Sequence, residues 1–477
     1  MRNMVTWFNG SIKAVTRTRH APYCCPPAGL RILPVRCWSS SDRLQISADG
    51  PAIGKWPVRV TLTKAMSTNL ISSGTTARQK VNLRTPDVMA AVQQQVESHY
   101  RSDIIEKVRR AGGIISVGDT TVRLAKQFGF CYGVERAIDL AYAARKVFKD
   151  RRLFIVGEII HNPEVNHQIA SLGIKNLTGK NKEADISDLG PDDVVIVPAF
   201  GTELSIQQQI KDRGCQIVDT TCGDVMSVWK RVRKYASESA TSIIHGKAEH
   251  EETKATSSRA LGDGSGHYVV VLTLADTDYV CDYIRHGGDK QAFLERFKGA
   301  HSPGFDPDVH LQTVGVANQT TMLRGETEEV QRRIRQAVLD RDGPELAEKN
   351  FRFFDTICGA TQERQDALRE LLNVPMDLLL VVGGYNSSNT SHLAEMGEEK
   401  LPTYFVLNAS RLVSATEIKH YDLHEKREVV SHFWVPNGPA VIGITAGASC
   451  PNNLIEETLI RLFELRGISH HQLELAA

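Results

Sequence analysis

The sequence of 477 residues predicts an α/β fold in which three similar units, each with a mainly parallel sheet, surround one centre. Short apolar runs alternate with segments whose apolar residues recur at three- and four-residue spacing, which is typical of strands alternating with amphipathic helices. A short motif around a cysteine also occurs three times, each time between an apolar run and a helical pattern. The runs expected to form strands are LFIVGEII, DDVVIVPAF, CQIVDTT, TSIIHG, YVVVLTL, TVGVANQ, LLLVVGG and AVIGITAG.

The N-terminal region differs in composition from the rest of the chain. Residues 1–86 contain thirteen Lys and Arg but only two acidic residues, Asp42 and Asp49, together with many Ser and Thr. This composition, without clear periodicity, predicts a cleaved organelle-targeting segment and linker over residues 1–85, with a disordered tail as the alternative. A secretory signal is disfavoured because no apolar stretch follows the first basic residues.

The remaining sequence divides into an extension and three units. Apolar residues at helical spacing predict a helical extension over residues 86–118. The three α/β units are expected over 119–221, 222–357 and 358–477, the last with the C-terminal segment. The second unit contains a stretch near 261–310 that is rich in Gly and Asp, which predicts a looped insertion.

Composition and charge exclude several classes of function. A net charge of +1 gives no support for a nucleic-acid or polyanionic partner. No run approaches the roughly 18 apolar residues that would span a bilayer, so a soluble mature protein is expected. Six cysteines outside the N-terminal region are widely dispersed, unlike a secreted disulfide framework.

Three of these cysteines are candidate metal ligands. FGFCYGVERAIDLA, IVDTTCGDVMSVWKRV and FFDTICGATQERQDAL place Cys131, Cys222 and Cys358 where a strand leads into a helix, and the first helical turn favours a thiolate. Structural zinc and [4Fe-4S] clusters normally take four ligands, so three thiolates would leave one open position for water or a substrate oxygen. Cys450 is a possible fourth ligand, whereas Cys215 is more typical of a core residue.

Polar residues follow each cysteine at nearly constant distance. His161 and Ser388 lie 30 residues after their cysteines and His250 lies 28 after Cys222, each near the end of a further strand. Glu252 is the candidate proton donor, and Thr320 could relay a proton or orient an alcohol. Solvated loop residues and helix N-caps are the alternative interpretation. The residues suited to holding phosphate oxygens are His161, His250, Ser387, Ser388, Asn389 and Ser449.

These motifs are also those of a known family. Between Asp119 and Ala448 the chain contains, in order, GFCYGVERA, EIIHNPEVN, DTTC, IIHGKAEHEET, ANQTTM, DTICGATQERQDA, VVGGYNSSNTSHLAE and TAGAS. It thereby resembles the 4-hydroxy-3-methylbut-2-enyl diphosphate reductases, which end the non-mevalonate isoprenoid pathway, and in particular their plant and cyanobacterial branch.

The resemblance implies a cofactor, a substrate and roles for the candidate residues. A [4Fe-4S] cluster would be held by Cys131, Cys222 and Cys358, with one open iron for the substrate alcohol. Glu252, with Thr320 nearby, would deliver protons. The electron donor would be ferredoxin, and the protein would work in the plastid (chloroplast stroma) after removal of its targeting segment. The diphosphate would be bound by His161, His250, Ser387, Ser388, Asn389 and Ser449.

Four positions depart from the family pattern. Phe200 stands where many bacterial members have a histidine, so that contact is not carried over. Gly223 and Asp224 follow Cys222 in place of the usual Pro-Trp, and a carboxylate beside a cluster disfavours the addition of electrons. Cys450 replaces a usual Thr or Ala and adds an oxidisable thiol.

Other classes of protein remain possible from the sequence. A non-catalytic iron-sulfur electron carrier or redox sensor on the same fold would not need Glu252 or the phosphate-binding residues. A cluster-dependent hydro-lyase would use an open iron without external electrons, and a structural zinc protein would need a closed shell of ligands.

Overall fold

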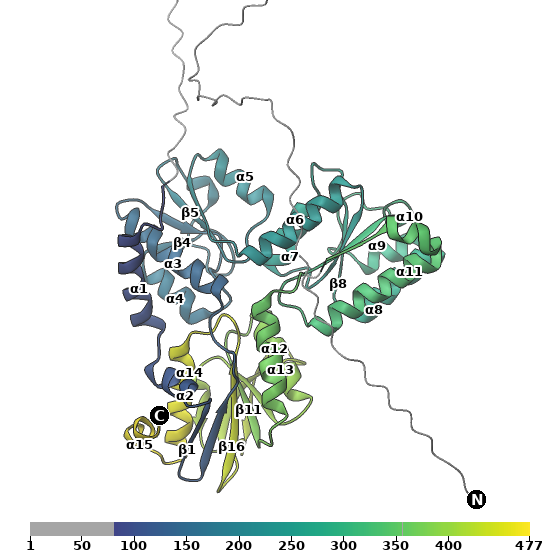
Figure 1. The fold of residues 1–477 in the computed structure, drawn as a ribbon. Helices are drawn as coiled ribbons and strands as arrows, with labels where there is room; N and C mark the ends of the chain where they lie inside the picture. The colour runs from purple at the N-terminus through teal and green to yellow at the C-terminus, as the bar shows by residue number, and fades with distance from the viewer. Residues whose placement is uncertain (1–80, 355) are drawn as a thin grey trace, which may run out of the picture. The chain divides into compact units, whose positions relative to one another are not determined.

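The computed structural model describes residues 81–354 and 356–477, which belong to one structural unit, Arg78–Ala477. The expected targeting segment therefore lies almost entirely outside the described residues. The described part contains three sheets, each with its own hydrophobic core (Figure 1). No helix in this part of the chain is both long and apolar enough to cross a membrane.

Two helices precede the first sheet: α1 packs against helix α3 of that sheet, whereas α2 packs into the core of the third sheet. The Ser102 hydroxyl caps α2 by accepting the Ile105 amide at 3.0 Å. Val92 and Tyr100 of α1 are buried in the same core as α3. The helices of this region are α1 (Pro86–Tyr100), α2 (Asp103–Arg110) and α3 (Tyr132–Val147).

The first sheet is parallel, with the order β4-β3-β5-β6. Its central strand is VVIV, which is buried at every position because helices cover both faces. The strands are β3 (Leu153–Ile155), β4 (Ile174–Asn176), β5 (Val194–Val197) and β6 (Gln216–Asp219); the connecting helices are α4 (Pro163–Ser171) and α5 (Leu204–Asp212), with a 3-10 turn, η1 (Ile186–Asp188).

The second sheet is also parallel, with the order β10-β9-β7-β8. Its strands are β7 (Thr241–His245), β8 (Tyr268–Val271), β9 (Val314–Asn318) and β10 (Phe351–Phe353). Its helices are α6 (Gly223–Ser237), α7 (Glu251–Ala260), α8 (Leu274–His286), α9 (Lys290–Arg296), α10 (Pro307–His310) and α11 (Arg324–Asn350), which is kinked at Gly343 (φ 73°).

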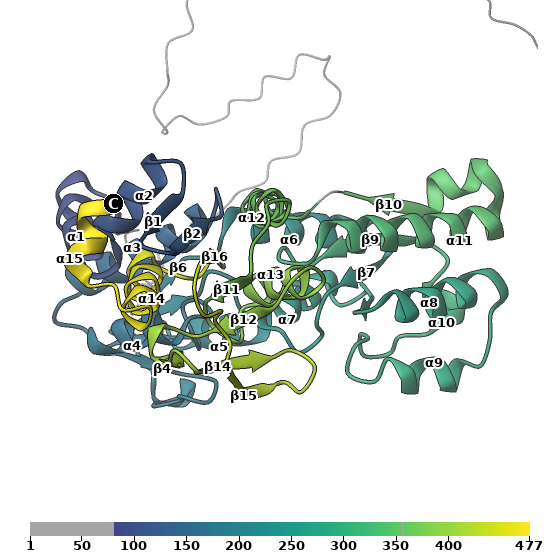
Figure 2. The ribbon, with the colours of Figure 1, turned by 90° about the horizontal axis from the view of Figure 1, so that it is seen from below.

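The prediction of a looped insertion near 261–310 is wrong, because the region contains β8, α8, α9 and α10 (Figure 2). Thr273 and Asp276 form a capping box that starts α8. Val280 and Ile284 of this helix are buried in the core of the second sheet. The Gly- and Asp-rich composition belongs to helix caps and short turns between these elements, not to a long loop.

The third sheet has eight strands and combines distant parts of the chain, in the order β1-β2-β16-β11-β12-β14-β13, with β15 paired to β14. The pairs β2–β16, β16–β11 and β11–β12 are parallel, and the remaining pairs are antiparallel. The strands are β1 (Ile114–Val117), β2 (Thr120–Leu124), β11 (Leu378–Val382), β12 (Thr403–Val406), β13 (Leu412–Ser414), β14 (Glu417–Asp422), β15 (Arg427–His432) and β16 (Ala440–Ala446). The helices are α12 (Gly359–Leu372), α13 (Ser388–Glu398), α14 (Asn452–Leu465) and α15 (His470–Ala476), with a 3-10 turn, η2 (Ala409–Arg411).

The position of β1 and β2 differs from the expected boundaries. Residues 86–118 were expected to be helical, but Ile114–Val117 form a strand. β2 lies at the expected start of the first unit but pairs with β16 of the third sheet, with Thr120 opposite Ala440 (Figure 1). Pairing between strands so distant in sequence leaves no local signal in the sequence.

Candidate active site

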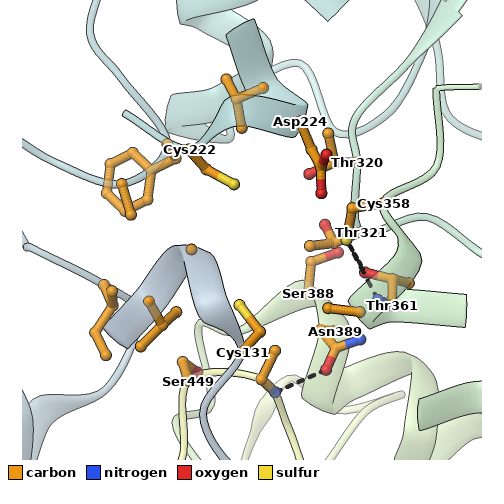
Figure 3. Close-up of a pocket in the computed structure, with 18 of the residues that line it drawn as sticks. Cys131, Cys222, Asp224, Thr320, Thr321, Cys358, Thr361, Ser388, Asn389 and Ser449 are labelled. Carbon is orange, nitrogen blue, oxygen red and sulfur yellow. Dashed lines mark hydrogen bonds between the residues drawn. The ribbon is translucent and has the colours of Figure 1, made fainter. Parts of the chain in front are cut away.

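Each of the three candidate metal ligands is the N-cap of a helix. Cys131 precedes α3, Cys222 precedes α6 and Cys358 precedes α12, all with extended backbone. Their amides donate to carbonyls at the ends of other strands: Ala448 (3.2 Å), Ala199 (2.8 Å) and Thr320 (3.3 Å), respectively. The three sulfur atoms are directed into one space (Figure 3).

That space is a cavity of about 610 Å³. It lies where loops from all three sheets meet, outside the carboxyl ends of parallel strands. Of the candidate residues, all but Cys450 line it: Cys131, His161, Cys222, His250, Glu252, Thr320, Cys358, Ser387, Ser388, Asn389 and Ser449.

The cavity walls leave room for the sulfurs only because one residue has no side chain. A Cβ on Gly133, in the first turn of α3, would lie 2.6 Å from the Cys222 sulfur and 3.8 Å from that of Cys131. The start of α3 therefore approaches Cys222 as closely as the backbone permits.

The spacing of the sulfurs fits a cluster better than a single ion. Within residues 81–354 and 356–477, the one set of three possible ligand atoms within 4.8 Å of one another belongs to His161, His250 and Glu251, so at least one pair of the three sulfurs is more than 4.8 Å apart. Zinc ligands at about 2.3 Å from one ion would be separated by about 3.8 Å. Three thiols around a wider space match an iron-sulfur cluster that lacks one protein ligand.

For two of the thiols, Cys222 and Cys358, burial opposes the effect of the helix position. Burial raises the pKa of Cys222, and it raises the pKa of Cys358 to about 12 although the Thr361 hydroxyl and amide lie 2.9 and 3.3 Å from the Cys358 sulfur. The expected preference for a thiolate is therefore outweighed by desolvation. Binding of a metal would displace these protons, and the Thr361 hydrogen bonds would then stabilise the thiolate.

Glu252 lies in the first turn of α7 and is 3% exposed. Its Oε1 accepts the Thr320 amide at 2.7 Å, and its Oε2 accepts the Thr320 hydroxyl at 3.1 Å. Burial nevertheless raises the pKa of Glu252 to about 7, because desolvation outweighs these two hydrogen bonds. A carboxylic acid that is still substantially protonated at neutral pH is suited to donate a proton.

Two histidines form an adjacent wall of the cavity. The ring of His161 stacks on Phe200 with centroids 4.6 Å apart and an angle of 4°, and it meets His250 edge-on at 4.9 Å. The Nδ1 atom of His161 lies 3.2 Å from a Glu158 oxygen. Phe200 thus supports the face of the His161 ring.

The free nitrogens of these rings suit an anion. His250 Nδ1 accepts the Glu252 amide at 3.2 Å, so the neutral ring carries its proton on Nε2, which makes that atom a donor instead of a metal ligand. Burial holds the pKa of His250 well below its usual value. The Nε2 atoms of His161 and His250 are buried without a hydrogen-bond partner, as is the Asn389 amide nitrogen. The Nε2 atom of His250 and the Asn389 amide nitrogen are donors and require an acceptor from a ligand or from water. In His161 it is Nδ1 that donates to Glu158, so its Nε2 atom is a donor only when both ring nitrogens carry a proton.

The start of α13 adds further polar groups to the cavity. Ser387 is the N-cap, and Ser388 and Asn389 are in the first turn, where unpaired amides and the helix dipole favour an anion. Asn389 Oδ1 accepts the Ala448 amide at 2.9 Å, which leaves its amide nitrogen as the donor. The Ser449 hydroxyl lies 3.2 Å from the His161 carbonyl oxygen and links two loops of the wall.

The structure also places the cysteines whose roles the sequence left open. Cys450 is fully buried in the core of the third sheet and does not line the cavity, so it is not a fourth ligand. Burial raises the pKa of its thiol, which disfavours the oxidation considered for it. Cys215 packs against the core of the first sheet, as expected.

Two further cavity residues were not identified from the sequence. Thr361 occupies the third helical position after the Cys358 N-cap, where a side chain can reach the cap residue. Arg364 is a buried arginine on the same helix. The first was detectable from its spacing to Cys358, whereas the second resembled an ordinary exposed helix residue.

Comparison with known proteins identifies the family of this chain. The model of the LytB protein family matches residues 122–463. A 4-hydroxy-3-methylbut-2-enyl diphosphate reductase of Thermosynechococcus vestitus is 48% identical over 379 residues, which cover 79% of this chain and 93% of that protein. The reductase of Gloeobacter violaceus is 47% identical over 384 residues, covering 80% and 91%.

A solved structure supports the fold. The E-1-hydroxy-2-methyl-but-2-enyl-4-diphosphate reductase from Plasmodium falciparum superposes with a TM-score of 0.52 and 22% identity, covering 72% of this chain and 87% of that one. The α/β prediction with mainly parallel sheets is thus confirmed. The chain belongs to the LytB family of 4-hydroxy-3-methylbut-2-enyl diphosphate reductases.

Proposed function

We propose that the protein removes the hydroxyl group of 4-hydroxy-3-methylbut-2-enyl diphosphate by reduction, giving isopentenyl and dimethylallyl diphosphates. The reaction breaks the C–O bond, consumes two electrons and two protons, and releases water. The observation that carries the proposal is the convergence of three cysteines, a buried acid and a set of unpaired donors on one cavity.

Cys131, Cys222 and Cys358 would hold a [4Fe-4S] cluster. When bound, such a cluster supplies one-electron transfer and, with only three protein ligands, one iron open to an oxygen ligand. The fit rests on the chemistry of the donors: three cysteine sulfurs that face one space and are too widely spaced for a single tetrahedral ion.

The diphosphate would lie against the unpaired polar atoms of the cavity wall. His161 and His250 offer buried Nε2 atoms, and Asn389 offers its amide nitrogen. Ser387, Ser388 and Ser449 add hydroxyl groups at the start of α13 and in the loop after β16. Together these groups replace the hydration of the phosphate oxygens and fix the orientation of the substrate.

Glu252 would deliver a proton to the reacting end of the substrate. Its carboxyl group is buried in the cavity wall and bonded to Thr320, which follows β9. The Thr320 hydroxyl lies beside both the acid and the cavity, so it can orient the substrate alcohol or pass on the proton.

The source of electrons and the cellular location follow from the same proposal. A soluble one-electron carrier such as ferredoxin would donate the electrons. The basic, Ser- and Thr-rich N-terminal segment would direct the protein to the plastid. Attachment of residues 1–80 to a fluorescent protein tests this location, and a fusion that stays in the cytosol would refute it.

The test of the function is turnover by anaerobically reconstituted protein lacking residues 1–80, with and without a low-potential one-electron donor. Donor-dependent formation of both five-carbon diphosphates is expected. Consumption of the substrate without a donor, to a dehydrated product that has not been reduced, would indicate a hydro-lyase. Absence of product from protein with a full cluster would favour an electron carrier or redox sensor.

A further inference from the structure

Arg364 connects the helix that begins at Cys358 with the loop that carries Cys131. Its Nε and Nη2 atoms donate to the Gly129 carbonyl at 3.2 and 2.6 Å, and Nη2 also donates to the Phe130 carbonyl at 3.1 Å. Nη1 donates to the Ala360 carbonyl in its own helix at 2.9 Å. One guanidinium thus joins the elements that position two of the three proposed cluster ligands.

Among the residues that the structure describes, the charge of this guanidinium has no carboxylate partner. Arg364 is 3% exposed, and within residues 81–354 and 356–477 no carboxylate oxygen lies within 4.0 Å of its nitrogens. All four hydrogen bonds go to backbone carbonyls, which solvate a cation but do not neutralise it. A buried charge without a counter-charge is costly, so an anion nearby is expected.

Several of the charged groups around Arg364 belong to the cavity. Arg364 lines it together with Cys131 and Cys358. The thiolate forms of these two cysteines are the strongest negative influences on the guanidinium, followed by Glu363, while Arg109 repels it. Glu135 also interacts with it from beyond ion-pair distance.

The charge of a second buried arginine, Arg259, is stabilised in a different way. Arg259 is 2% exposed and lies over the Trp229 ring at 3.4 Å, where the π-electrons stabilise its charge. It does not line the cavity. Arg364 has no comparable ring contact among the described residues; the groups whose negative charge would act on it are Glu135 and Glu363, beyond ion-pair distance, and the cysteines of the cavity.

We propose that Arg364 is the counter-charge of the iron-sulfur cluster and raises its reduction potential. The inference rests on the proposed function, because it requires a cluster on the three cysteines. Thiolate ligands make the cluster site anionic, and each added electron makes it more so. A fixed cation in a poorly solvated wall stabilises the reduced state more than the oxidised state. Arg364 is thus a positioning residue that acts through the cluster and its ligand loop.

Three variants separate this role from loop anchoring. Arg364→Gln removes the charge, and Arg364→Lys keeps the charge but cannot form the forked contact with Gly129 and Phe130. Arg369→Gln makes the same change of charge on the exposed face of the same helix, where Arg369 pairs with Asp366 at 2.7 Å. The measurements are iron content and the midpoint potential of the reconstituted holoprotein, followed by electron paramagnetic resonance.

We expect a lower midpoint potential for Arg364→Gln, and potentials close to wild type for Arg364→Lys and Arg369→Gln. A fully loaded Arg364→Gln protein with an unchanged potential would overturn the proposal. If Arg364→Gln does not retain iron, Arg364→Lys decides: a loaded cluster at the wild-type potential supports the role of charge, and loss of the cluster assigns Arg364 to loop anchoring alone. Absence of a cluster from reconstituted wild-type protein would instead refute the proposed function.

Discussion

Glu252 combines full burial with two hydrogen bonds that favour its ionised form. Desolvation dominates, so the pKa of its carboxyl group rises to about 7. The donors from Thr320 limit this rise and fix the direction of the acid in the cavity. The result is a proton donor whose protonated and ionised forms are both populated near neutral pH, which is the condition for efficient general acid catalysis.

Replacement of Glu252 by Gln should keep the cluster and substrate binding but lower kcat by about 100-fold or more. Because the acid form is populated below a pKa of about 7, wild-type turnover should fall as the pH rises through that value, and the variant should lack this limb. Steady-state turnover from pH 6 to 9 checks both. Glu249→Gln, at an exposed position whose side chain pairs with Lys254 at 2.9 Å outside the cavity, is the control and should retain the wild-type profile. Wild-type rates for Glu252→Gln would remove this residue from the mechanism.

At the scale of elements, the site is formed by the N-termini of five helices, whose first turns line one cavity. Those of α3, α6 and α12 present cysteines, and those of α7 and α13 present Glu252 and polar groups. The sequence revealed these positions because each motif lies between a strand pattern and a helical pattern. It did not reveal the close approach of α3 to Cys222, because this contact depends on the packing of two helices from different units.

That approach can be tested with a matched pair of glycines. Gly133→Ala should strongly reduce the iron retained after reconstitution, because its Cβ would lie 2.6 Å from the Cys222 sulfur. Gly223→Ala, in the first turn of α6, meets nothing within 4 Å and should retain full iron. Its helix should be as stable or slightly more stable, since Ala is favoured over Gly in helices by up to about 1 kcal/mol. Iron per chain and the thermal unfolding midpoint are the measurements. Full iron in Gly133→Ala would show that the cysteine can move away without losing the cluster.

At the scale of the whole described molecule, the repeated pattern predicted three units and a shared centre. It did not predict which strands from distant parts of the chain pair with one another. The eight expected strands all form. β1 and β2, by contrast, complete the third sheet through pairing with β16, and the insertion in the second unit folds into helices. Local periodicity identifies strands and helices, whereas pairing across hundreds of residues depends on tertiary contacts. Arg364 was missed for the same reason, since its partners lie 235 and 234 residues away in the sequence.

The N-terminal helices provide the last test at this scale. Val92 is 1% and Tyr100 8% exposed because α1 packs against α3, and the Tyr100 hydroxyl lies 3.3 Å from that of Tyr142. Deletion of residues 1–80 should leave turnover and the thermal midpoint unchanged if that segment serves only targeting. Deletion of residues 1–101 also removes α1 and exposes the core beside the helix that begins at Cys131. It should lower stability by about 2 kcal/mol or more, and reduce iron retention. Thermal unfolding and iron content of the two truncated proteins distinguish these outcomes. Equal stability of both would show that α1 is dispensable, whereas loss of folding in the shorter deletion would assign residues 1–80 a structural role.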